Sequence, residues 1–146
     1  MDTEIRINAE QAVPKAVIFT AEITDEVKEA VRKLSEKSPR IITGIKDGIT
    51  QILEPEQLYR IYSGGGKVMA VTDEGEFILK SRLYEMEEML DGMKFVRISN
   101  SELINLKKVK GFDLSLTGTI CVKMKDKSVT YVSRRYVTKI KKILGI

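Results

Sequence analysis

The sequence contains no histidine and no tryptophan, and it has a single cysteine, Cys121. The absence of histidine removes the most common general base and the most common metal ligand of proteins. Cys121 cannot form an internal disulfide, and it stands in an alternating strand pattern without a histidine to activate it. We therefore interpret it as a small core residue rather than a nucleophile, and we expect no enzymatic activity.

Long hydrophobic runs are also missing, because stretches such as residues 16–19 are far too short to cross a bilayer. Residues 1–6 carry two acids and no following apolar stretch, which is unlike a signal peptide. Together with the single cysteine, these features predict a cytoplasmic protein in a reducing compartment.

Motifs for small ligands are equally scarce. The three glycines 64–66 lack the spacing of a phosphate-binding P-loop, and a strand pattern rather than a helix follows them. The acidic residues at 85, 87, 88 and 91 fall on the outer face of a predicted helix, where we interpret them as solvated surface. We therefore predict no catalytic residue, no bound metal, no cofactor and no small-molecule substrate.

Positive charge is concentrated at the C-terminal end. Residues 93–146 hold thirteen basic and three acidic residues, a net charge of +10, whereas the preceding 92 residues carry −6. A segment this basic attracts polyanions and gains binding free energy from the counterions that they release. A solvated lysine-rich surface is the alternative interpretation of the same charge.

The first 39 residues form a separate pattern. Residues 13–20 are rich in β-branched side chains and predict a strand. Thr24 is placed to cap a helix, and Ser38-Pro39 is placed to end it. The apolar face of this helix consists of Val27, Ala30, Val31 and Leu34. The sequence thus predicts an N-terminal β-α appendage over 1–39 and a second domain over 40–146.

From residue 40 onward the pattern changes to short strands separated by turn signals, such as Asp47-Gly48 and the segment 63–66. The predicted strands are 41–46, 49–53, 57–62, 67–72, 76–79, 93–98, 114–116, 119–124 and 128–132. Helices are predicted at 82–90 after Ser81 and beyond Ser133, with a short helical turn at 102–105. Because the strands cluster in sequence, we predict an α+β fold that is mainly antiparallel β.

Three polar segments stand out as candidate sites. Asn100 lies in a turn, where its amide either bonds to its own backbone or reaches the N6 and N7 atoms of adenine. Arg134 and Arg135 begin a helix whose dipole they oppose, so phosphate or guanine contacts explain them better than folding does. Lys67 directly follows the glycine-rich turn. We interpret it either as a solvated lysine or as a contact to a phosphate.

These segments resemble a LytTR-type DNA-binding domain from about residue 40 to 146. The residues that carry the resemblance are Phe95, Arg97, Ser101, Ile104, Asn105 and Val109, followed by the block Val132-Ser133-Arg134-Arg135-Tyr136, with the helix at 82–90 upstream. Two positions depart from the family pattern, since Ser99 stands where histidine is frequent and Gly66 offers no side chain.

The resemblance implies that loops rather than a recognition helix enter the DNA major groove. Lys67, Asn100 and Arg135 would then contact bases. The residues expected to contact the DNA backbone are Arg97, Ser99, Ser101, Lys107, Lys108 and Arg134. Gly66 has no side chain to contact a base, and Ser99 replaces a frequent histidine. Base readout would therefore rest mainly on Asn100 and Arg135, with part of the specificity taken from DNA shape.

The resemblance also suggests partners. The first 40 residues are too few for a receiver domain, so the chain resembles short, free-standing family members that bind paired promoter repeats. It implies a transcription regulator that binds double-stranded DNA as a homodimer, with a small membrane protein as a possible regulator. The alternative function is a non-catalytic RNA-binding or protein-interaction module that uses the same basic face.

Overall fold

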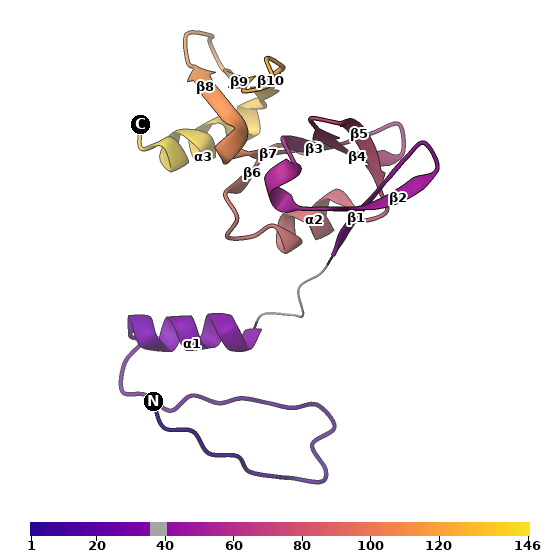
Figure 1. The fold of residues 1–146 in the computed structure, drawn as a ribbon. Helices are drawn as coiled ribbons and strands as arrows, with labels where there is room; N and C mark the ends of the chain where they lie inside the picture. Colours follow the sequence, from indigo (N-terminus) through magenta and orange to yellow (C-terminus); the bar gives the residue numbers. More distant parts are fainter. Residues whose placement is uncertain (36–40) are drawn as a thin grey trace. The chain divides into compact units, whose positions relative to one another are not determined.

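The structure is a computed structural model, and it describes residues 1–35 and 41–146 (Figure 1). The chain divides into two units, Met1–Pro39 and Arg40–Ile146. The predicted helix stop at Ser38-Pro39 and the predicted boundary after residue 39 lie outside the described residues.

Within residues 1–35, the described part of the N-terminal unit, there is one helix, α1 (Asp25–Ser35). The Thr24 hydroxyl accepts a hydrogen bond from the Val27 amide at 3.3 Å, so the predicted cap is confirmed. The predicted strand at 13–20 is wrong, because this segment is extended but pairs with no other strand of the described chain. Residues with high β propensity become a strand only where a neighbour completes the hydrogen-bond ladder.

The C-terminal unit is built on two antiparallel sheets. Their strands are β1 (Ile42–Lys46), β2 (Ile49–Leu53), β3 (Arg60–Gly64), β4 (Lys67–Thr72), β5 (Gly75–Leu79), β6 (Phe95–Ser99), β7 (Glu102–Asn105), β8 (Val109–Asp113), β9 (Ile120–Met124) and β10 (Val129–Val132). The larger sheet has the order β2-β1-β5-β4-β3-β7-β6, and the smaller has β10-β9-β8. The predicted mainly antiparallel fold is confirmed.

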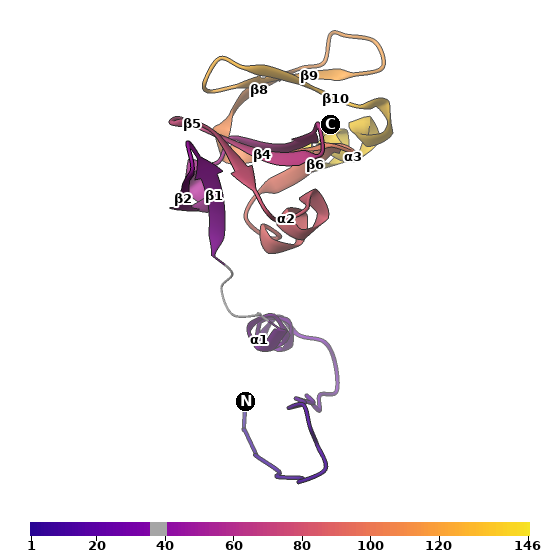
Figure 2. The same ribbon diagram turned by 90° about the vertical axis from the view of Figure 1, so that its right-hand side faces the viewer.

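Two helices pack on this framework, α2 (Leu83–Met89) and α3 (Arg134–Leu144). Figure 2 shows three layers within the C-terminal unit, with α2 on one face of the large sheet and the small sheet on the other. Short 3₁₀ turns occupy Pro55–Gln57 and Leu106–Lys108. This layering divides the interior into two apolar cores.

The first core lies between the large sheet and α2, and the second between that sheet, the small sheet and α3. The first includes Ile61, Phe77, Met86 and Leu103, all nearly fully buried. The second includes Ile98, Ile104, Val122 and Ile140. Strand β7 supplies both, since Leu103 and Ile104 point to opposite faces of the sheet. It is therefore buried along its whole length.

Three local predictions are wrong. Residues 102–105 form strand β7 rather than a helical turn, because pairing with β3 and β6 outweighs the local preference. The segment 114–116 is a loop, and the strand there ends at Asp113. Ser81 does not cap α2, since Arg82 is the N-cap residue and its amide donates to the Glu85 carboxylate at 3.1 Å.

A buried polar link ties the two sheets together. Glu102 of β7 accepts a hydrogen bond from the Arg60 guanidinium at 2.7 Å and another from the Thr130 hydroxyl on β10. Glu102 and Thr130 are both buried. A buried charge is tolerated where it is paired, as Glu102 is with Arg60. The hydrogen bond from Thr130 to Glu102 also fixes the position of β10 against the large sheet.

Candidate nucleic-acid interface

Three connections that are distant in sequence meet at one end of the large sheet. The Ser63 amide, beside the β3–β4 turn, donates to the Ser101 carbonyl at 2.8 Å in the β6–β7 turn. The Ser133 amide, before α3, donates to the Ile98 carbonyl at 2.9 Å. We call the segments 63–67, 99–101 and 133–136 the three-turn edge. The side chains of Lys67, Asn100 and Arg135 all belong to it.

The β3–β4 turn is tight because it is made of glycine. Gly65 and Gly66 have φ angles of 59° and 76°, a left-handed conformation that other residues rarely adopt. The turn places Gly64 opposite Lys67 in the register of the hairpin. Gly66 therefore shapes the backbone, and the Lys67 side chain is the first that this turn presents to solvent.

Arg97 organises the β6–β7 turn from inside the protein. Its guanidinium donates to the Ser99 carbonyl at 2.8 Å, to the Asn100 carbonyl and to the Glu87 carboxylate of α2 at 3.0 Å. Its side chain is only 17% exposed. These contacts leave the guanidinium little capacity for a phosphate, although Arg97 was predicted as a DNA backbone contact.

The side chains of the β6–β7 turn are held as well. The Ser101 amide donates to the Ser99 hydroxyl at 3.2 Å, and the two hydroxyls are 3.3 Å apart. The Tyr136 hydroxyl of α3 donates to Oδ1 of Asn100 at 3.2 Å. The Asn100 side chain is thus tied to another element rather than to its own backbone, and its Nδ2 group stays available as a donor.

The cations at this edge are exposed and lack acidic partners. Lys67, Arg134 and Arg135 are all exposed, and the ion pairs of the described residues include none of them. The guanidinium of Arg134 lies beside Gly118, in the loop between β8 and β9. An unpaired cation on a rigid edge is free to meet an external anion.

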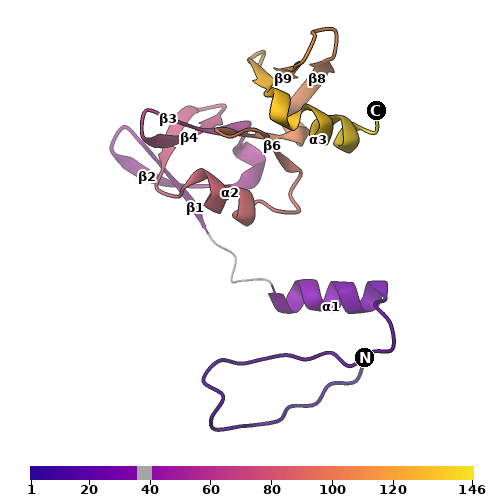
Figure 3. The ribbon, with the colours of Figure 1, turned by 180° about the vertical axis from the view of Figure 1, so that it is seen from behind.

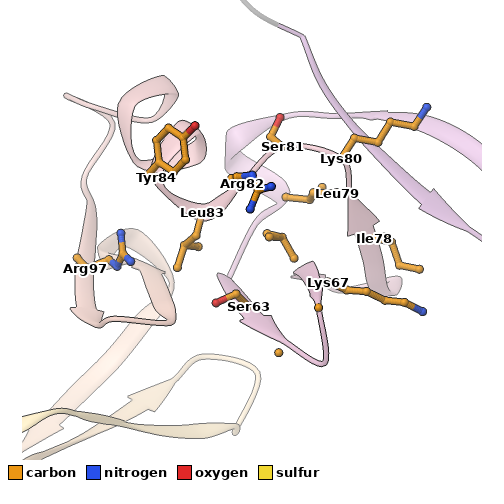
Figure 4. Close-up of a pocket in the computed structure, with 13 residues that line it drawn as sticks. Ser63, Lys67, Ile78, Leu79, Lys80, Ser81, Arg82, Leu83, Tyr84 and Arg97 are labelled. Atoms are coloured by element: carbon orange, nitrogen blue, oxygen red, sulfur yellow. The ribbon is translucent and has the colours of Figure 1, made fainter.

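A groove next to the three-turn edge contains cations that the sequence did not single out. It is lined by Lys67, Lys80, Ser81, Arg82 and Arg97, together with apolar residues of β4, β5 and α2. Figure 4 shows Lys67 on β4, Lys80 and Arg82 on the segment before α2, and Arg97 on β6, with the Lys67 and Lys80 side chains extending away from Arg97. Lys80 and Arg82 are separated from Lys67 by strands β4 and β5, so only the fold brings them together.

Two predicted contacts lie elsewhere. Lys107 and Lys108 follow the far end of β7, since Phe95 pairs with Asn105 there while Ser99 pairs with Glu102 at the turn. The ammonium of Lys108 sits 5.0 Å from the centre of the Tyr59 ring. The structure therefore separates both lysines from the three-turn edge by the length of a strand.

Asn105, which carries part of the family resemblance, is structural. It is buried, its amide donates to the Leu58 carbonyl at 2.9 Å, and its oxygen accepts from the Lys107 amide at 3.0 Å. On β3, burial and then the hydrogen bond to the Glu76 carboxylate raise the pKa of Tyr62. Neither side chain is available to a nucleic acid in the way that Asn100 is.

Among residues 1–35 and 41–146, no three acidic or cysteine side chains come together as a metal site. Glu87 of the predicted acidic surface instead binds Arg97. In the same part of the chain, no helix has the length and apolar character needed to span a membrane.

Two proteins of Staphylococcus aureus, from strains MSSA476 and NCTC 8325 / PS 47, are each 30% identical to this chain over 147 residues. The alignments cover 100% of this chain and 99% of each relative, and both relatives are described as uncharacterized HTH-type transcriptional regulators. A helix-turn-helix needs two helices joined by a short turn. In the described residues of this chain, five strands separate α2 from α3.

The fold also matches a solved structure, the LytTr DNA-binding domain of a Bacillus cereus protein. The TM-score is 0.69 at 19% identity, over 73% of this chain and 99% of that domain. The sequence pattern of the LytTr DNA-binding domain matches residues 49–145, which is most of the chain. This chain therefore belongs to the LytTr DNA-binding domain family.

Proposed function

We propose that the chain regulates transcription by binding double-stranded DNA, and that the three-turn edge enters the major groove. The observation that carries this proposal is the convergence of Lys67, Asn100 and Arg135 on one rigid edge, with exposed side chains and no internal ion pairs. A major groove is wide enough to admit such an edge and displays a distinct set of donors and acceptors for each base pair. The family and the names of the relatives support a DNA-binding regulator.

In this proposal the residues divide by chemistry. Arg135 offers a planar fork that matches O6 and N7 of guanine, and Asn100 offers its Nδ2 hydrogens to acceptors on a base edge. Lys67 assists as a mobile cation. Backbone contacts come from Arg134, Lys80 and Arg82, and from the hydroxyls of Ser99 and Ser101.

Arg97 takes a different role from the one expected of it. We propose that it positions the β6–β7 turn, because it already binds two carbonyls of that turn and Glu87. Lys107 and Lys108 lie outside the proposed contact area, so they serve as internal controls.

The test compares Arg135→Ala with Lys107→Ala, because each variant loses one exposed cation. We expect Arg135→Ala to weaken binding to a site selected from random duplexes by about 1–3 kcal/mol and to relax base preference at one position. Lys107→Ala should retain both affinity and preference. Equal losses on selected and random DNA for Arg135→Ala would contradict base contact by this residue.

An RNA-binding module remains the second candidate function. Proteins that bind single strands stack bases on exposed aromatic side chains. In residues 41–146 the exposed aromatics are Tyr131 on β10 and Tyr84 on α2, and Tyr84 lines the groove beside the three-turn edge. The edge itself therefore presents no fully exposed ring on which a base could stack. This distribution favours a duplex. Competition with duplex and single-stranded oligonucleotides of the same sequence separates the two functions, since better competition by the single strand would favour RNA.

Binding of paired repeats as a homodimer on DNA is a further part of the proposal. Two copies on adjacent half-sites would each use one three-turn edge. The spacing of half-sites recovered from the random pool measures this arrangement directly, because copies on one face of the duplex need spacings near a whole helical turn. A regulatory membrane protein is a partner that the family resemblance alone suggests.

A further inference from the structure

We propose that the N-terminal unit is a self-association module, in which α1 and the extended segments before it pair with those of a second copy of this chain. The proposal concerns the chain in the absence of DNA. It is independent of the DNA-binding function proposed above.

The first observation is that this unit has no core of its own. None of the residues 1–35 is buried. Large apolar side chains are exposed along all of it, namely Ile5, Ile7, Val13, Val17, Phe19, Ile23, Val31 and Leu34. Exposed apolar surface on this scale marks an interaction site. Units below about 40 residues usually need disulfides, metals or oligomerisation to fold, and the single cysteine of the chain, Cys121, lies outside this unit.

The second observation concerns the backbone. Figure 3 shows two extended segments of the N-terminal unit that run past each other without forming a sheet. Before Thr24, the one hydrogen bond between backbone groups in this unit joins the Gln11 amide to the Asn8 carbonyl. Ile5 and Ile7 are two residues apart, as are Val17 and Phe19, so each pair would lie on one face of a strand if its segment paired. Apolar extended segments with free backbone edges are templates for strand pairing.

The third observation identifies the partner as a second copy. Helix α1 has an apolar stripe of Val27, Ala30, Val31 and Leu34, with Asp25 and Glu26 in its first turn and Arg32 and Lys33 in its last. If two such helices pack antiparallel through the stripe, the acidic end of each lies opposite the basic end of the other. The helix dipoles are then also opposed favourably. A surface that complements itself in this way suits a two-fold dimer.

The stripe is tested first on the full chain without DNA, by sedimentation velocity over about a hundredfold range of protein concentration. We expect a dimer for the unchanged chain and a monomer for Val31→Gln/Leu34→Gln. The matched control Lys28→Gln/Ser35→Gln places the same two side chains on α1 outside the stripe and keeps the ion pair between Arg32 and Glu29, so it should remain a dimer. A urea denaturation curve of each variant, compared with that of the unchanged chain, shows that its C-terminal unit is folded.

A charge exchange then tests the identity of the partner. Asp25→Lys/Glu26→Lys and Arg32→Glu/Lys33→Glu should each raise the dimer dissociation constant by at least about tenfold, and an equimolar mixture should recover a heterodimer. A monomeric unchanged chain, or a mixture that does not associate, would overturn the proposal. If the unchanged chain is a monomer and the stripe substitutions lower its free energy of unfolding, the stripe packs within its own copy, which would also overturn the proposal.

Discussion

At the scale of single residues, the proposed interface depends on how firmly Asn100 is held. The guanidinium of Arg97 donates to the Asn100 carbonyl, and the Ser63 amide donates to the carbonyl of the next residue, Ser101. The Tyr136 hydroxyl donates to Oδ1 of the Asn100 side chain. Side chains that are already positioned in the free protein lose little conformational entropy when the complex forms. In the proposed interface, this positioning would let Asn100 discriminate between bases although the turn has Ser99 where related domains often have histidine.

Tyr136→Phe tests whether the amide orientation matters. Removing the hydroxyl frees Oδ1 of Asn100, so the amide can rotate and offer either its donor or its acceptor. We expect a loss of up to about 1.5 kcal/mol on the selected site and a broader base preference at one position, with little change in stability. Tyr131→Phe on β10 is the matched control. A base preference identical to that of the unchanged chain would contradict this role of Tyr136.

Arg97→Gln distinguishes positioning from phosphate contact. If Arg97 positions the turn, affinity falls while the dependence of log K on log salt keeps its slope. A direct phosphate contact would instead lower the slope by about one unit. Titrations at several salt concentrations measure both quantities, and a denaturant melt shows whether the variant is folded.

At the scale of elements, the large sheet needs close approach at Gly44 on β1. A Cβ atom there would lie 2.7 Å from the Leu53 Cδ1 atom and 2.7 Å from the Phe77 Cβ atom. Real Cβ atoms do not approach other carbons so closely, and both neighbours belong to the first core. The glycine is therefore required by packing between β1, β2 and β5 rather than by a turn.

Gly44→Ala is expected to lower the free energy of unfolding by about 1–3 kcal/mol through overpacking. Gly64→Ala is the control, because a Cβ at Gly64 meets nothing within 4 Å. Urea denaturation measures both. Equal stability of the two variants would show that β1 shifts to accommodate the methyl group.

At the scale of the whole molecule, positive charge is uneven along the sequence, and the fold then decides which cations lie close together in space. Among the basic C-terminal residues, Arg134 and Arg135 belong to the three-turn edge, whereas Lys107 and Lys108 follow the far end of β7. Lys80 and Arg82 line the groove beside the edge, although they come from a part of the chain that is acidic on average. Net charge attracts DNA over long distances, but counterion release depends on which cations touch phosphates.

Lys80→Ala and Lys107→Ala separate these two effects. Both remove one exposed positive charge, so their long-range effects are matched. We expect Lys80→Ala to reduce the salt slope by about one unit and Lys107→Ala to leave it unchanged. The opposite result would move the duplex toward the far end of β7, where Lys107 and Lys108 were first expected to act.

Most of the strands could be predicted, because hairpins such as the one at Asp47-Gly48 depend on local turn residues and on the alternation of apolar and polar side chains. The errors fell where a neighbour decides the structure. Residues 13–20 have strand composition but no partner, and residues 102–105 become a strand because β3 and β6 flank them. The internal partners of Arg97, on α2 and in the β6–β7 turn, could not be predicted either, because a one-dimensional pattern does not show which segments lie side by side.

The amino-acid sequence by itself determined the class of fold, the capped helix α1, the family and the three turns that carry Lys67, Asn100 and Arg135. These features follow from local backbone preferences and short-range motifs. Only the tertiary structure decided which cations share one edge, because Lys80 and Arg82 reach it across strands β4 and β5 while Lys107 is carried away along β7. Strand pairing is a long-range interaction, and it alone turns distance along the chain into proximity in space.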